Sequence, residues 1–269
     1  MKIVRVPDTG ERARYGSLTE RGQIRPIEGD IFGEFALTDE LLDASGLQRV
    51  LPPVDPPVVM AAGLNYKSHA DEGGHPYPQA PLLFMKAPTS VVGPEDDIVL
   101  PHTAPDEVDY EAELAVVIGR RAKNVPADSA REFILGYTCG NDVTARDCQM
   151  RLDRQWTRAK SFDTFCPLGP CIATDVDPDN LDIKLTLNGK TMQHSNTSDL
   201  IFPVNELVSY ISRNMTLRPG TVVMTGTPAG VGVMRQPPVY LKPGDVVEVT
   251  IEGIGTLRNS VVLELPSDA

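Results

Sequence analysis

Residues 110–119 read Tyr110-Glu111-Ala112-Glu113-Leu114-Ala115-Val116-Val117-Ile118-Gly119, which is a β-strand by composition. Side chains two positions apart on a strand lie on the same face, so Glu111 and Glu113 are expected to point the same way. Two adjacent carboxylates repel each other and are costly to bury. A divalent cation would offset that cost, whereas a solvated strand face would avoid it. The spacing alone leaves both interpretations open.

A third carboxylate follows in the segment Gly140-Asn141-Asp142-Val143-Thr144-Ala145-Arg146-Asp147. Asp142 follows an apolar, strand-like run at 133–139, and it could complete a site made only of oxygen ligands. Such hard ligands favour Mg²⁺, Mn²⁺ or Ca²⁺ over zinc or copper. Taken by itself, Asp142 could equally be a turn or cap residue.

A candidate general base lies in the segment Asn65-Tyr66-Lys67-Ser68-His69-Ala70-Asp71-Glu72-Gly73-Gly74, which resembles one helical turn ending at a glycine pair. His69 and Glu72 are three positions apart and hence neighbours on a helix face. A carboxylate beside an imidazole orients it and raises its basicity. The glycine pair and residues 75–78 indicate a mobile segment, such as a lid. The alternative is a surface turn with an incidental pair.

Two further residues could contact an anionic substrate. Lys160 lies among apolar residues at 156–163 and could bind a substrate carboxylate, although surface lysines commonly have this pattern. Residues 223–232 form a strand that runs into a glycine-rich loop, where Thr227 could offer its hydroxyl and backbone N–H to an anion. This loop lacks the spacing of a P-loop or a dinucleotide-binding fingerprint, so nucleotide binding is not expected.

Composition limits the class of protein. The 269 residues allow one large domain or a domain with a small appendage, and 22 glycines with 24 prolines favour turns and short strands. A net charge of −12 argues against nucleic acid and anionic membranes as partners. We find no apolar leader and no membrane-length apolar run, which predicts a cytoplasmic protein. The four cysteines lack metal-site spacing and are expected to be reduced thiols.

We divide the chain into a small N-terminal domain with a proline-rich linker, residues 1–57, and a catalytic domain, residues 58–269. The first part is expected to contain a strand at 2–6, a hairpin at 13–26 and a short helix at 39–44 that begins after Thr38 and ends before Gly46. The second part is expected to be mainly β with some α. Its predicted strands are 58–62, 82–85, 112–118, 183–187, 221–225 and 246–252, and its predicted helices are 127–133 and 204–214.

Six phrases, in this order, resemble the fumarylacetoacetate hydrolase family, in its acylpyruvase, oxaloacetate decarboxylase and 2-hydroxyhepta-2,4-diene-1,7-dioate isomerase branch. They lie between residues 63 and 232, and the turn at 242–245 extends the similarity towards the end of the chain. The phrases are Gly63-Leu64-Asn65-Tyr66 with His69 and Glu72, Tyr110-Glu111-Ala112-Glu113-Leu114, Gly140-Asn141-Asp142-Val143-Thr144-Ala145-Arg146, Ala159-Lys160-Ser161-Phe162, Asn196-Thr197-Ser198-Asp199 and Thr225-Gly226-Thr227-Pro228-Ala229-Gly230-Val231-Gly232.

The resemblance implies a mixed β-sandwich roll with a small N-terminal α+β domain, and usually a homodimer. It also implies the roles of nine residues: Glu111, Glu113 and Asp142 bind Mg²⁺ or Mn²⁺; His69 and Glu72 form the catalytic pair; Lys160 lies near the polar oxygens of the substrate; Arg146, Gln149 and Thr227 contact its carboxylate or keto groups. Lys86 lies in another family-like phrase, and we assign it no role.

These implications lead to a hypothesis about the reaction. A small 2-oxo acid would chelate the cation, and breaking the adjacent bond would leave an enolate whose charge the cation stabilises. The leading hypothesis is hydrolysis of a C–C bond in an acylpyruvate-type 2,4-dioxo acid, with His69 and Glu72 activating water. The alternatives are an oxaloacetate decarboxylase, a 2-hydroxyhepta-2,4-diene-1,7-dioate isomerase of aromatic catabolism, a 2,4-diketo-3-deoxy sugar-acid hydrolase and a ureidoglycolate lyase. A non-catalytic metal- or ligand-binding protein is a different class, but such a protein need not keep His69, Glu72 and Lys160.

Overall fold

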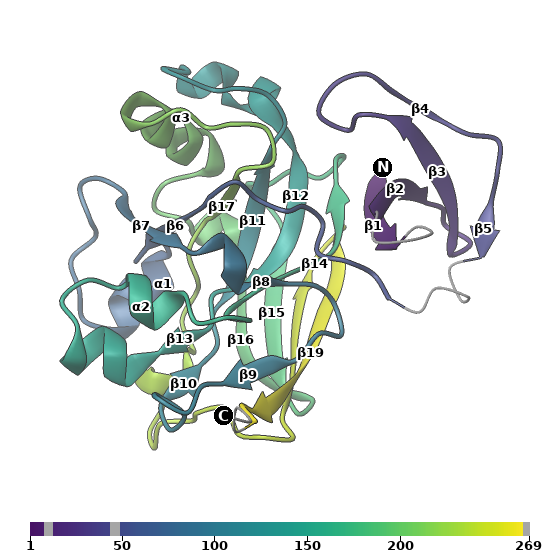
Figure 1. Cartoon of the computed structure of the whole chain (residues 1–269). Helices are drawn as coiled ribbons and strands as arrows, with labels where there is room; N and C mark the ends of the chain where they lie inside the picture. Colours follow the sequence, from purple (N-terminus) through teal and green to yellow (C-terminus); the bar gives the residue numbers. More distant parts are fainter. Residues whose placement is uncertain (8–12, 44–48, 266–269) are drawn as a thin grey trace.

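The computed structural model describes residues 1–7, 13–43 and 49–265, and these residues are organised mainly in β-sheets with few helices (Figure 1). This confirms the expected fold class. Within the described residues, no helix has both the length and the apolar character needed to cross a membrane. All four cysteines are buried free thiols, as expected.

The largest sheet runs from the N-terminal strands into the part of the chain that follows residue 58. In spatial order its strands are β4 (Phe35–Leu37), β3 (Gln23–Gly29), β2 (Ala13–Leu18), β1 (Lys2–Pro7), β14 (Cys166–Ala173), β12 (Ile134–Asn141), β11 (Ala112–Ile118), β17 (Val222–Met224), β6 (Val59–Gly63) and β7 (Leu82–Lys86). Two short strands lie off this path: β5 (Leu42–Asp43) pairs with β3, and β8 (Val91–Val92) pairs with β14.

A second sheet of five strands provides the other wall of the main core. Its strands are β16 (Lys190–Asn196), β15 (Asp182–Leu187), β18 (Val246–Ile251), β19 (Gly255–Leu263) and β9 (Ile98–Leu100). A separate two-stranded ladder joins β10 (Val108–Asp109) to β13 (Thr144–Ala145). Leu114 of β11, Leu185 of β15 and Val249 of β18 belong to one buried cluster, as expected when two sheets pack face to face.

Strand β11 is buried along its whole length. Leu114 and Val116 contribute to the cluster between the sheets, whereas Ala115 and Val117 contribute to a second cluster on the opposite face. Because both faces of this strand are covered, its sequence is an almost continuous apolar run instead of an alternating one. Glu113 therefore lies within an enclosed strand, and Glu111 directly precedes that strand.

The helices are short and few. Helix α3 (Val204–Asn214) covers the predicted range and buries Val204, Leu207, Val208 and Ile211, the spacing of an amphipathic helix. Helices α1 (Lys67–Glu72) and α2 (Thr157–Lys160) carry site residues, and a π-helical turn at Cys148–Leu152 precedes α2. The predicted helix at 127–133 is a 3₁₀ helix, Ala127–Phe133.

The N-terminal part agrees with the sequence except for its helix. The predicted strand is β1 and the predicted hairpin is β2 with β3. The helix predicted at 39–44 was wrong, because residues 39–41 are not helical and Leu42–Asp43 forms β5 beside β3; Ala44 and Gly46 lie outside the described residues. Pairing with β3 satisfies the backbone groups of β5 and packs Leu42 against the core, and this outweighs a weak local helix signal. The described residues of this part form strands only.

Candidate metal centre and active site

The register of β11 and β12 brings three carboxylates together. Ala112 pairs with Asn141 and Glu113 with Gly140, so Asp142 follows β12 directly beside Glu111. The backbone N–H of Asp142 donates to the carbonyl oxygen of Glu111 at 2.9 Å. Carboxylate oxygens of Glu111, Glu113 and Asp142 lie within 4.8 Å of one another, and all three residues are buried.

Three cations surround two of these carboxylates. Lys160 Nζ donates to Glu111 Oε2 at 3.0 Å and to Asp142 Oδ2 at 2.6 Å. Lys86 Nζ donates to Asp142 Oδ1 at 2.5 Å, and Arg146 Nη2 donates to Glu111 Oε1 at 2.6 Å. Both lysines are buried, so Lys160 is not a surface lysine. Charged pairs in such an environment persist because each partner compensates the other's lost hydration.

Glu113 differs from its two neighbours. Its Oε2 accepts the backbone N–H of Gly226 at 2.7 Å, but within the described part of the chain no cationic side chain forms an ion pair with it. Burial raises the pKa of Glu113 well above its usual range, and the charges of Asp142 and Glu111 raise it further. Burial also raises the pKa of Glu111, but Lys160 and Arg146 outweigh it and lower this pKa to about 2.

A divalent cation would compensate the charge of Glu113, which has no described ion-pair partner. Three buried carboxylates converge, and among the described residues cationic side chains form ion pairs with two of them, Glu111 and Asp142. Hard oxygen ligands of this kind suit Mg²⁺ or Mn²⁺. The residues present therefore fit the divalent metal that the family resemblance implies.

The pair His69 and Glu72 lies on α1, and His69 lines the same cavity as Glu111 and Glu113. His69 Nδ1 is 3.4 Å from Glu72 Oε2, and both oxygens of Glu72 accept the backbone N–H of Gly230 at 3.1 Å. Partial burial raises the pKa of Glu72, but the hydrogen bonds from His69 and Gly230 outweigh it and lower this pKa. With Nδ1 directed at a carboxylate, the other ring nitrogen of His69 is left for a water or a substrate proton.

Arg146 connects the carboxylates to a neighbouring amide. Its Nε donates to Asp109 Oδ1 at 2.6 Å and its Nη1 donates to Gln149 Oε1 at 2.8 Å, in addition to its bond with Glu111. The second oxygen of Asp109 accepts the N–H of Val233 at 2.8 Å. Arg146 therefore orients Glu111 and Gln149 whether or not it also contacts substrate. Asp109 is a buried partner that the sequence analysis missed.

Thr227 is tied to β11. Its hydroxyl donates to the carbonyl oxygen of Ala112 at 2.9 Å and accepts from Gln193 Nε2 at 2.8 Å. Gln193 Oε1 in turn accepts the N–H of Ala112 at 2.9 Å. Because the hydroxyl hydrogen is engaged with the protein, an anion at Thr227 would use the backbone N–H. Sequence reasoning also missed Gln193, because no local motif marks it.

A cavity of about 340 Å³ joins these groups. Its lining includes seven of the nine residues singled out in the sequence: His69, Glu111, Glu113, Arg146, Gln149, Lys160 and Thr227. Asp142 and Glu72 lie directly behind that lining, in contact with Lys160 and His69. Residues 73–78 contact α1, because the Tyr77 hydroxyl donates to Asp71 Oδ1 at 3.1 Å. The mobility expected of this segment stays a prediction.

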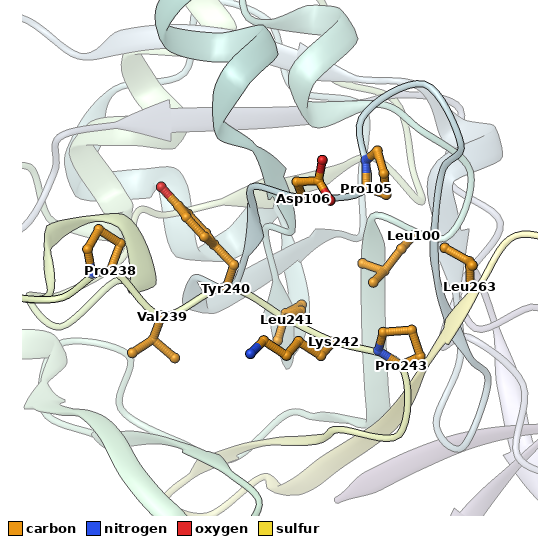
Figure 2. Close-up of a pocket in the computed structure, with 10 residues that line it drawn as sticks. All are labelled: Leu100, Pro105, Asp106, Pro238, Val239, Tyr240, Leu241, Lys242, Pro243 and Leu263. Carbon is orange, nitrogen blue, oxygen red and sulfur yellow. The ribbon is translucent and has the colours of Figure 1, made fainter.

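A second pocket, of about 650 Å³, lies between the loop of Pro105 and Asp106 and the segment 238–243 (Figure 2). Its lining residues include no histidine and a single carboxylate, Asp106. Figure 2 shows Tyr240 and Lys242 along one edge of this pocket and Leu263 near its end. It therefore lacks the convergent acidic and basic groups that the smaller cavity has.

Comparison with known proteins identifies the family of the chain. Residues 58–262 match the family described as fumarylacetoacetate (FAA) hydrolase C-terminal, and residues 1–53 match the one described as Rv2993c-like, N-terminal. The chain therefore belongs to the fumarylacetoacetate hydrolase family, an enzyme family whose members generally bind divalent metal.

Three relatives illustrate the range of this family. An uncharacterized protein of Archaeoglobus fulgidus is 54% identical over 236 residues, which cover 86% of this chain and 91% of the relative. Oxaloacetate tautomerase FAHD2A, mitochondrial, of Bos taurus is 46% identical over 226 residues, covering 82% and 72% of the two chains. A crystal structure named 5-carboxymethyl-2-hydroxymuconate delta-isomerase, from Mycobacterium smegmatis, has 43% identity and a TM-score of 0.88, covering 98% of this chain and all of the other.

Proposed function

We propose that this chain is a divalent-metal-dependent enzyme that converts a small 2-oxo acid through its enolate. The observation that carries the proposal is the buried triad of Glu111, Glu113 and Asp142, in which Glu113 has no cationic partner among the described side chains. Mg²⁺ or Mn²⁺ held there would supply positive charge beside the carboxylate and keto oxygens of the substrate.

The chain's own residues bind and orient the substrate around that centre. The Lys160 ammonium lies between Glu111 and Asp142 and retains a third hydrogen for a substrate oxygen. Gln149 is oriented through its carbonyl oxygen by Arg146, which leaves its NH₂ group free to donate. These donors lie in a largely buried site, where hydrogen bonds to a developing negative charge are strong.

For the reaction we place first hydrolysis of an acylpyruvate-type 2,4-dioxo acid, supported by the His69–Glu72 pair in the cavity wall. His69 accepts a proton from water, and the oxygen of that water attacks the carbonyl carbon at C4. The C3–C4 bond then breaks, its electron pair passes to C3, and the resulting pyruvate enolate takes a proton at C3. The products are one carboxylic acid and pyruvate.

A second candidate is keto–enol conversion of oxaloacetate through its own enolate; decarboxylation is a related reaction, in which CO₂ leaves and the pyruvate enolate remains. The relatives named oxaloacetate tautomerase, 44–46% identical to this chain over about four fifths of its length, favour it. In this reaction His69 moves a proton between C3 and the oxygen on C2, and no water is consumed. The two candidates therefore differ in whether the base must activate water.

The test is a panel of 2-oxo acids assayed with Mg²⁺ or Mn²⁺ and after chelation, for the wild type and for His69→Ala. We expect metal-dependent cleavage of acylpyruvates, reduced by roughly 10²–10⁴-fold in His69→Ala, the usual share of general-base catalysis. Decarboxylation of oxaloacetate should suffer less, because it needs no activated water. Equal losses would mean that the pair orders the site, and unimpaired hydrolysis would remove His69 as the base. No turnover of any 2-oxo acid would refute the proposed function.

A further inference from the structure

The polarity of the active-site cavity changes from its buried end to its mouth. Glu113 and Lys160 at the buried end are 1% and 2% exposed. Met150, Leu82 and Met234 also line the cavity, but they are 62%, 46% and 37% exposed. Large apolar side chains gathered around an opening commonly mark a binding surface.

The apolar wall of the cavity consists of Leu82, Phe84, Met150, Trp156 and Met234, and the packing of the fold holds it in place. The rings of Phe84 and Trp156 meet edge to face, with centroids 5.5 Å apart and an interplanar angle of 74°. Trp156 packs so closely on Gly63 that an added Cβ there would lie 2.8 Å from its ring. The Phe84 ring also lies 5.2 Å from Lys160 Nζ, so the wall begins at the polar end of the cavity. Strand alternation places Leu82 and Phe84 on this side of β7 and Met85 on the other.

The charged groups that line the cavity are concentrated at its buried end. The charged groups are Glu111, Glu113, Arg146 and Lys160; beyond them, His69 and His75 are the titratable side chains among the described lining residues. A substrate carboxylate near the mouth would find no lysine or arginine in that lining, and partial burial without a partner is unfavourable for a charge. An alkyl or aryl group in the same place would gain from burial.

We propose, building on the proposed function, that the substrate is a 2-oxo acid whose substituent beyond C3 is apolar, an alkyl or aryl group. The 2-oxo acid head lies at the buried end. The substituent lies against Phe84 and Trp156 and extends to Leu82, Met150 and Met234. Trp156 and Met150 are then specificity-determining residues.

The first experiment measures kcat/KM with Mg²⁺ for acetylpyruvate, butanoylpyruvate and hexanoylpyruvate. Burial of each added methylene should raise kcat/KM by about fourfold until the chain leaves the cavity. Succinylpyruvate is the matched charged probe, because it carries a carboxylate where butanoylpyruvate has its terminal methyl group. We expect its kcat/KM to be lower by about tenfold or more. No gain with chain length, or a preference for succinylpyruvate, would overturn the proposal.

Variants locate the effect in the wall. Trp156→Ala and Met150→Ala should lower the ratio of kcat/KM for hexanoylpyruvate to that for acetylpyruvate by about fivefold or more. Met85→Ala is the matched control, because Met85 is 46% exposed on the opposite side of β7 and does not line the cavity. It should keep the wild-type ratio. The same ratio in all three variants would show that the wall does not select the substituent.

A binding measurement separates this proposal from the proposed function. Trp156 is the single tryptophan of the chain, so its fluorescence reports on the cavity wall without turnover. Pyruvate, 2-oxopentanoate and 2-oxooctanoate are titrated in the presence of Mn²⁺, and we expect affinity to rise with chain length by about fourfold per methylene. If affinity rises with chain length but no 2-oxo acid is turned over, the proposed reaction is refuted and the apolar subsite is supported. If turnover occurs without dependence on chain length, the apolar subsite fails alone.

Discussion

Glu113 is the residue on which metal binding depends most directly, because the protein offers its buried carboxylate a backbone N–H and no described ion pair. Glu113→Gln keeps the shape but removes a charged ligand. We expect Mn²⁺ affinity to fall by roughly 100-fold or more, since loss of an outer-shell partner alone typically costs 10–100-fold. The free energy of unfolding without metal should not decrease, because the substitution replaces a buried carboxyl that has no described cationic partner with a neutral side chain of similar shape.

Calorimetry with Mn²⁺ and urea unfolding measure the two quantities. Glu206→Gln, on the exposed side of α3, is the control and should behave as the wild type. Wild-type Mn²⁺ affinity in Glu113→Gln would remove Glu113 from the ligand set.

Asp109 acts through its contacts with Arg146 and with the loop at Val233. Asp109→Asn would remove one of the two carboxylates that the buried Arg146 guanidinium contacts. It would also place the NH₂ group of the new asparagine beside an N–H donor, either of Arg146 or of Val233. Breaking a buried ion pair in this way typically costs about 3–5 kcal/mol. We expect a loss of that order in urea unfolding, together with weaker Mn²⁺ binding through the misplaced Glu111. Asp106→Asn, an exposed change in the loop that precedes β10, should alter neither quantity, and a stable Asp109→Asn variant would show that Asp109 is dispensable.

At the scale of elements, Glu72 fastens α1 to the glycine-rich loop through the N–H of Gly230. The pKa of Glu72 lies below its ordinary value of 4.5. A carboxyl whose pKa is lowered by folding contributes stability above its unfolded pKa and loses that contribution as pH falls through the folded pKa. The contact between helix and loop should therefore persist at neutral pH and loosen only below about pH 4.5.

The backbone amide resonance of Gly230 in a ¹⁵N-glycine-labelled sample reports this contact. We expect it to titrate with a midpoint below pH 4.5 in the wild type and to show no such transition in Glu72→Gln. A midpoint at or above 4.5 would mean that the contact does not favour the ionised carboxylate in solution. Because Glu72 is partly exposed, little change in global stability should accompany the transition.

At the scale of the whole molecule, the resemblance to the family predicts a homodimer. Light scattering at micromolar protein should give a particle of twice the 29.2 kDa chain mass. Dilution should not change this mass if the interface has the size of a permanent one. A particle of 29.2 kDa at micromolar concentration would contradict the prediction.

The sequence by itself was sufficient for features that depend on local periodicity. The alternation of side chains along a strand was enough to expect Glu111 and Glu113 together, and the spacing of apolar residues was enough to place α3 at Val204–Asn214. An apolar run at 133–139 was enough to expect Asp142 near a strand end, but not to separate a metal ligand from a turn or cap residue. The ordered family phrases added the remaining site residues and the overall fold.

Only the tertiary structure decided which distant residues complete the site. Lys86 reaches Asp142 across 56 positions, and Gln193 reaches Ala112 across 81, through the pairing and packing of strands. The same kind of contact turned the expected N-terminal helix into β5, because β3 offered hydrogen-bond partners that local propensity does not register. Local spacing carries no information about strand order in a sheet, and strand order sets these contacts.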